Sequence, residues 1–134
     1  MDIKKEKVLC QKQWAKNKYL VLSYSSKIYL EIRTYLKQEE VSLEKVNKFI
    51  KQAINLPEDK GQVTNALHHV WGYFKKFATK EEKDNFFEMI EDYHINKTTK
   101  EDLIEEEKKL LEKYPNTYLE QSTFINGGKD ETLA

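Results

Sequence analysis

Apolar residues recur along most of the chain at the three-to-four-residue spacing of one face of an α-helix. Residues 19–22 depart from this pattern because they are all apolar. Such a segment forms either a short strand or a helix that is buried on every side, and the lack of a partner strand favours the helix. The pattern predicts helices over residues 3–23, 27–38, 42–55, 61–78 and 98–114, another that begins at 79, and a helical turn at 118–121.

Polar motifs and prolines mark where these helices begin and end. Ser42 is a good N-cap, and Thr79-Lys80-Glu81-Glu82 and Thr98-Thr99-Lys100-Glu101 have the sequence of capping boxes. Pro57 and Pro115 are expected to end the helices before them. We therefore expect an all-α, single-domain bundle of about five to six helices over residues 1–134, with a frayed tail from about residue 122.

The composition excludes several classes of protein and site. Of the 134 residues, 39% are hydrophobic and only 4 are Gly and 2 Pro, which does not fit a disordered chain or a β-sandwich. The single Cys10 excludes a disulfide scaffold, and the 3 histidines lack the spacing of a zinc motif, so we expect no metal and no cofactor. The absence of a signal sequence and of a long apolar run leads us to expect a cytoplasmic protein.

Charge is divided unevenly between the two parts of the chain. The totals balance, with 23 Lys+Arg and 23 Asp+Glu, but residues 1–80 contain 16 basic and 8 acidic residues and residues 81–134 contain 7 and 15. The asymmetry indicates either an electrostatic partner or two halves that neutralise each other in the fold. The acidic run at 101–107 is expected to be a solvated helix face.

The helix predicted over 61–78 has an unusual polar face. Asn65, His69, Tyr73 and Lys76 share this face with Gly72, a residue that costs about 1 kcal/mol relative to Ala inside a helix. Three interpretations are open: tight packing of another helix on buried polar residues, a surface for a ligand or nucleic acid, and, least favoured, catalysis. The opposite face is expected to be core and consists of Val63, Ala66, Leu67, Val70, Phe74 and Phe77.

Lysines alternate with aromatic residues in the N-terminal part of the chain, as at Lys18-Tyr19. Ammonium groups bind phosphates and exposed aromatic rings stack on unpaired bases, so this pattern is compatible with RNA binding. The alternative is that the aromatic residues form the core and the lysines solvate the exterior.

The run from Asn65 to Lys76 closely resembles the Asn-x-Leu-x-His-x-x-Gly-Tyr-Phe-Lys hallmark of the YbgA-like family, a bacterial domain of unknown function. The resemblance extends from about Trp14 to Gln121. Its supporting matches are Lys18-Tyr19-Leu20-Val21-Leu22, Ser25, Tyr29, Ile90-Glu91-Asp92-Tyr93 and Tyr118-Leu119-x-Gln121.

The resemblance implies a function in RNA binding. Members occur alone or fused to an iron–sulfur desulfidase domain that acts on thiolated uracil or thiouridine, where the YbgA-like part is thought to hold RNA, tRNA in particular. This chain lacks the cysteines of the desulfidase. The resemblance therefore implies a separate module that works with a desulfidase-type enzyme partner.

We expect a non-catalytic RNA-binding accessory domain, with RNA, and tRNA in particular, as its partner. The alternative is a protein-interaction or structural module in which Asn65, His69 and Tyr73 are buried and bonded to one another. No catalytic or metal-binding residue is predicted. The predicted RNA-binding residues are Lys18, Tyr19, Asn65, His69, Tyr73, Lys75 and Lys76.

Overall fold

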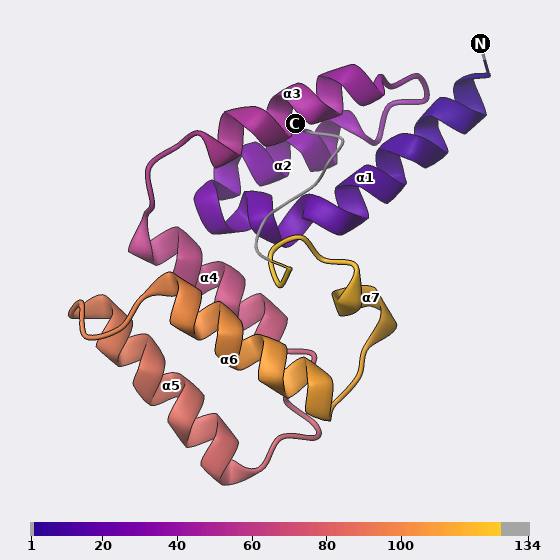
Figure 1. The fold of residues 1–134 in the computed structure, drawn as a ribbon. Helices are drawn as coiled ribbons and strands as arrows, with labels where there is room; N and C mark the ends of the chain where they lie inside the picture. The colour runs from indigo at the N-terminus through magenta and orange to yellow at the C-terminus, as the bar shows by residue number, and fades with distance from the viewer. Residues whose placement is uncertain (1, 127–134) are drawn as a thin grey trace.

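The computed structural model describes residues 2–126, which form a bundle of helices with no strand in this range (Figure 1). The predicted all-α class is confirmed. The helices are α1 (Ile3–Tyr24), α2 (Ser26–Tyr35), α3 (Leu43–Ile54), α4 (Lys60–Trp71), α5 (Lys80–His94), α6 (Lys100–Lys113) and the short α7 (Thr117–Glu120).

The helices surround two hydrophobic clusters that meet at the end of α1. One cluster joins α1, α2 and α3 through residues such as Val21, Ile32 and Ile50. The other joins the end of α1 to α4, α5, α6 and residues 119–125. Residues 19–22 contribute to both clusters, which explains why the helix is apolar on every side there and why its exposure is at most 7%. The predicted central helix is confirmed.

Side-chain caps begin α3 and α5 where the sequence predicts them, whereas the cap of α6 is Thr99 rather than the predicted Thr98. Ser42 accepts a hydrogen bond from the backbone N–H of Lys45, and Thr79 and Glu82 form a complete capping box at the start of α5. At α6, the hydroxyl of Thr99 accepts from the N–H of Asp102. Each cap satisfies backbone donors that a helix start would otherwise leave without a partner.

Helix α4 is shorter than predicted. It ends at Trp71 rather than near residue 78, and turns follow over residues 72–77. In these turns the N–H of Tyr73 donates to the carbonyl of Val70 and the N–H of Phe74 donates to the carbonyl of Trp71, a tighter pattern than that of an α-helix. The changed direction places Phe77 on the surface, with 64% of its area exposed, so its prediction as a core residue is wrong.

Two further predictions about burial are wrong. Glu107 is completely buried, although the acidic pattern at 101–107 predicts a face that is solvated throughout. Ser122, Thr123, Phe124 and Ile125 are also buried, whereas the sequence predicts a tail that frays from about residue 122. Residues 127–134, the remainder of that predicted tail, lie outside the described residues.

Candidate nucleic-acid interface

The polar face of α4 is open to solvent. Asn65 and His69 are exposed, as are Gly72, Lys75 and Lys76 in and after the last turn of the helix. Their position follows from the apolar stripe on the other side of α4, which is fixed in the core. The interpretation that another helix packs on these polar residues is therefore wrong for Asn65 and His69.

Tyr73 is the residue of this face that packs inward. Its hydroxyl shares a 2.8 Å hydrogen bond with the hydroxyl of Tyr19 on α1, and the two rings meet edge to face at 6.1 Å. Its ring also stacks on that of Tyr118 from α7, with 6.1 Å between centroids and 18° between planes. Segments that are far apart in the sequence thus converge at Tyr73, which is partly buried.

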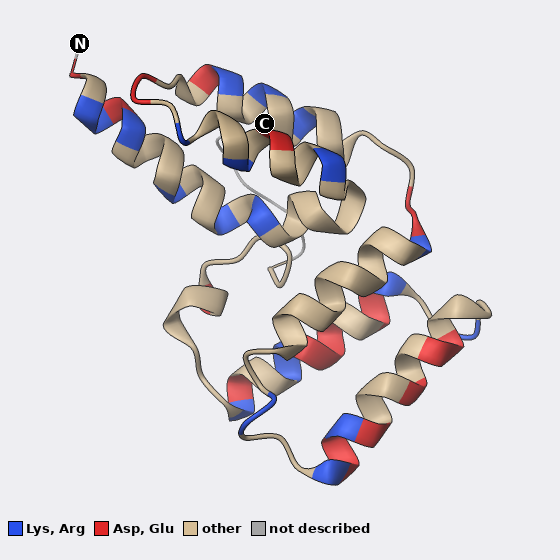
Figure 2. Cartoon of the chain, turned by 180° about the vertical axis from the view of Figure 1, so that it is seen from behind, with Lys and Arg blue, Asp and Glu red and all other residues tan. Residues whose placement is uncertain are grey.

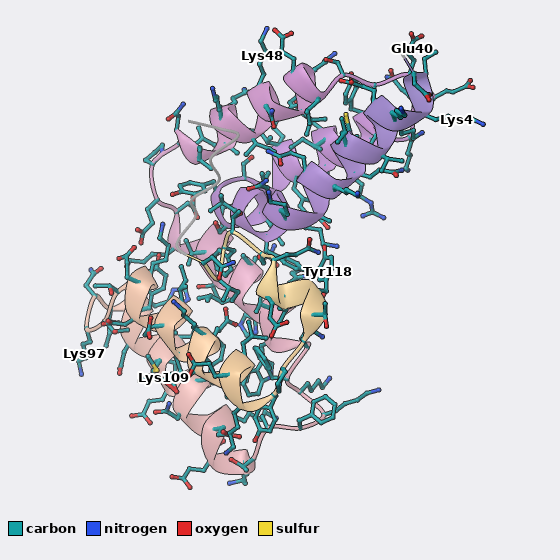
Figure 3. The ribbon with its side chains drawn as sticks, turned by 45° about the vertical axis from the view of Figure 1, so that its right-hand side comes forward. Lys4, Glu40, Lys48, Lys97, Lys109 and Tyr118 are labelled. Carbon is teal, nitrogen blue, oxygen red and sulfur yellow. The ribbon has the colours of Figure 1, made fainter. Side chains whose placement is uncertain are left out.

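Lys18 completes this group, which we call the tyrosine cluster: Lys18, Tyr19, Tyr73 and Tyr118. The ammonium group of Lys18 lies 5.2 Å from the ring centroids of both Tyr19 and Tyr118. Figure 3 shows Tyr118 on α7, beside the end of α1. Lysine at this distance from an aromatic ring makes a favourable cation–π contact, which holds one positive charge over the cluster.

Tyr19 supports the cluster from below rather than at its surface, because only 6% of its area is exposed. Burial and the hydrogen bond with Tyr73 raise the pKa of its hydroxyl well above the usual value for tyrosine. The phenol therefore stays protonated, and it can both donate and accept a hydrogen bond.

The segment that presents Tyr118 is fastened to α1 by polar contacts. The hydroxyl of Tyr118 donates to the carbonyl of Ala15 at 3.2 Å. The backbone N–H of Thr123 donates to the carbonyl of Lys16 at 2.9 Å, and its hydroxyl donates to the side-chain oxygen of the buried Asn17 at 2.7 Å. These bonds fix the position of the Tyr118 ring against Tyr73.

Ion pairs within residues 2–126 do little to neutralise the basic part of the chain with the acidic part. The pairs are Lys48–Glu44, Lys80–Asp84, Lys100–Glu58 and Lys113–Glu82. Two of them join residues 1–80 to residues 81–134. Lys80–Asp84 lies within the single helix α5. In Lys100–Glu58 the carboxylate belongs to residues 1–80, so this pair neutralises none of the lysines there. Figure 2 shows basic residues along α1–α3. Among the helices that follow, α5 and α6 carry most of the acidic residues. Specific pairing in the described range therefore does not support the interpretation that the two halves neutralise each other.

The predicted site residues fall into two adjoining groups. Lys18, Tyr19 and Tyr73 meet in the tyrosine cluster, while Asn65, His69, Lys75 and Lys76 lie on the exposed surface that begins on α4. Sequence reasoning left Tyr118 out of the predicted site. Tyr118 belongs to a motif that matches the YbgA-like family, as do Lys18-Tyr19 and the Gly-Tyr-Phe-Lys motif. This shared match was the signal that could have added Tyr118 to the predicted site.

The residues that meet in the cluster also lie within one family match. The family described as "Protein of unknown function (DUF1722)" matches residues 18–127, most of the chain. The chain belongs to the DUF1722 family. The DUF1722 match begins at Lys18 and includes Tyr73 and Tyr118, so it contains every member of the tyrosine cluster. No curated protein and no solved structure matches the chain significantly.

Two other properties of residues 2–126 bear on what the site can do. None of the helices in this range is long and apolar enough to cross a membrane. No group of His, Cys, Asp and Glu side chains in the same range is arranged to hold a metal ion. The chemistry offered by the surface consists of ammonium groups, amide and imidazole hydrogen-bonding groups, and aromatic rings.

Proposed function

We propose that this DUF1722 protein is an RNA-binding accessory domain without catalytic activity of its own. The observation that supports the proposal best is the exposed surface beside the tyrosine cluster, where exposed ammonium groups adjoin ordered aromatic rings. Lysines neutralise phosphates without regard to sequence, while aromatic rings and amide groups contact bases that are unpaired.

Each residue has a distinct part in the proposed complex. Lys18, Lys75 and Lys76 bind phosphates, and Asn65 and His69 donate or accept hydrogen bonds. Tyr73 and Tyr118 form the aromatic edge of the surface. Tyr19 is a positioning residue, because its buried hydroxyl holds that of Tyr73 at 2.8 Å.

The resemblance to YbgA-like proteins favours a particular context for this function. We propose tRNA as the RNA, the bacterial cytoplasm as the location and a desulfidase-type enzyme as the partner. In that arrangement the catalytic cysteines belong to the partner, since this chain has only Cys10, which is buried.

Binding to bulk tRNA across a series of salt concentrations tests the proposal. The logarithm of the binding constant is expected to fall linearly with the logarithm of salt concentration. The double variant Lys75→Ala/Lys76→Ala should reduce the slope by about 2, because each lysine that binds a phosphate accounts for about 1. The matched control is Lys97→Ala/Lys109→Ala, which removes two exposed lysines from the region of α6 (Figure 3) and should leave the slope unchanged.

His69→Ala separates the proposal from the structural alternative. Because His69 is exposed, the variant should unfold at the same urea concentration as the natural protein and bind tRNA more weakly. Absence of tRNA binding at low salt, or binding that does not respond to salt, would show that the proposal is wrong.

A further inference from the structure

Phe77 is a large aromatic residue at the surface whose position is fixed by the backbone. The residue is 64% exposed, the highest value among the large hydrophobic residues of the described range. Its N–H donates to the carbonyl of Phe74 at 2.9 Å, and the N–H of Ala78 donates to the same carbonyl at 2.9 Å. The turn that presents the ring is therefore ordered by its own hydrogen bonds.

One side of the Phe77 ring is covered by Tyr114, which follows α6. The two rings stack with 6.2 Å between their centroids and 22° between their planes. The hydroxyl of Tyr114 donates to the carboxylate of Glu82 at 2.7 Å, and Glu82 in turn accepts from the N–H of Thr79 at 2.8 Å in the capping box of α5. A chain of contacts to α5 and α6 thus supports the exposed ring from beneath.

The charges around this ring leave two ammonium groups available. Lys75 and Lys76 precede Phe77 directly, are exposed, and form no ion pair within residues 2–126. The nearby carboxylate of Glu82 is bound to Lys113 at 3.0 Å, which offsets its charge. Within the described range, this surface therefore combines an exposed aromatic ring with two positive charges that no ion pair offsets.

The geometry points to Phe77 as a stacking platform for an unpaired base of single-stranded RNA. This inference rests on the proposed function and narrows its ligand to an RNA segment with accessible base faces. Stacking on an aromatic ring tolerates any base, and neighbouring lysines hold the adjacent phosphates. A continuous duplex does not present its base faces, so it would be bound through its phosphates and 2′-hydroxyl groups without stacking.

The test uses a fluorescently labelled ten-nucleotide oligouridine, a strand of the same length without bases, and a ten-base-pair RNA duplex. Phe77→Leu keeps an apolar side chain but removes the ring, and Phe77→Tyr keeps the ring. Phe77→Leu should weaken oligouridine binding about fivefold or more, with an unchanged salt slope, and should not alter binding of the strand without bases. Phe77→Tyr should bind as the natural protein does.

A second readout reports the stacking itself. A 2-aminopurine base placed within the oligouridine should lose fluorescence when it binds the natural protein and keep most of it when it binds Phe77→Leu. Because Phe77 lies outside the core, urea denaturation of both variants should match that of the natural protein.

The possible failures are distinguishable. Tight oligouridine binding that Phe77→Leu leaves unchanged overturns the stacking platform and leaves the proposed function in place. A protein that binds none of the RNAs at low salt overturns both. Sedimentation that shows a dimer for the natural protein and a monomer for Phe77→Leu assigns the ring to self-association and overturns the inference.

Discussion

Glu107 is an acid in the hydrophobic interior of the bundle. Its side chain is completely buried on α6, and neither carboxyl oxygen has a hydrogen-bond partner in the described structure. Burial raises the pKa of this carboxyl well above its usual value of about 4.5. The folded protein therefore holds a proton on Glu107 at pH values where the unfolded chain has released it.

This difference in proton binding makes stability depend on pH in a defined direction. Because the pKa of Glu107 is raised in the folded state, its contribution to stability is fully present below about pH 4.5. The contribution is lost as the pH rises to and through the pKa that Glu107 has in the folded protein. Within that window the free energy of unfolding should fall by about 1.4 kcal/mol for each pH unit, because one additional proton is bound in the folded state.

Urea denaturation followed by tryptophan fluorescence, from about pH 5 to about pH 8, measures this slope. Glu107→Gln keeps the shape of the side chain but cannot titrate, so subtracting its pH profile isolates the contribution of Glu107. Glu107→Leu removes the buried polar group and should stabilise the protein at neutral pH by about 1–3 kcal/mol. Glu105→Gln, an exposed position on the same helix, is the matched control.

The reasoning is refuted if Glu107→Gln and the natural protein have parallel pH profiles over this range. It is also refuted if Glu107→Leu is destabilised at neutral pH, since that result would show that the carboxylate has a favourable partner. A change in Glu105→Gln as large as that in Glu107→Gln would show that surface charge, rather than burial, causes the slope.

Two further predictions concern the tyrosine cluster and the start of α5. Tyr73→Phe leaves the buried hydroxyl of Tyr19 without its 2.8 Å partner and should lower the free energy of unfolding by about 1–2 kcal/mol in urea, whereas Tyr29→Phe should change it by less than about 0.5 kcal/mol. Hydrogen bonds from the N–H of Thr79 and the hydroxyl of Tyr114, with Lys113 nearby, lower the pKa of Glu82 to about 2. Its contribution to stability is present above about pH 4.5 and is lost as pH falls through about 2; NMR titration of the carboxyl carbon should show this value, and Tyr114→Phe should raise it.

Local signals in the sequence predict the helices well, because caps and apolar spacing act over a few residues. Thr79 and Glu82 form the expected capping box, and residues 19–22 form the expected central helix. The end of α4 could not be predicted in this way. Apolar spacing continues through Phe77, whereas the tighter turns after Trp71 occur where Tyr73 packs against Tyr118, a residue far away in the sequence.

In the candidate site, too, features set by neighbouring residues could be predicted from the sequence, whereas contacts between distant segments could not. The spacing of Asn65 and His69 predicts that they share a face, and the structure places both on the surface. Their exposure could not be deduced from spacing, because a polar face can meet either water or another helix. The meeting of Tyr73 with Tyr118 depends on the path of the chain after α6, which periodicity does not specify.

The attachment of Thr123 to Asn17 has a consequence for the order of folding during synthesis. Helices α1 to α3 make their shared cluster from neighbouring segments, so they can associate soon after they leave the ribosome. Helix α4 covers the apolar end of α1 in part, and the cover is complete only when residues 119–125 have been made and reach back to α1 across most of the chain. A nascent chain that stops before this segment would leave part of the apolar end of α1 exposed and become a substrate for chaperones.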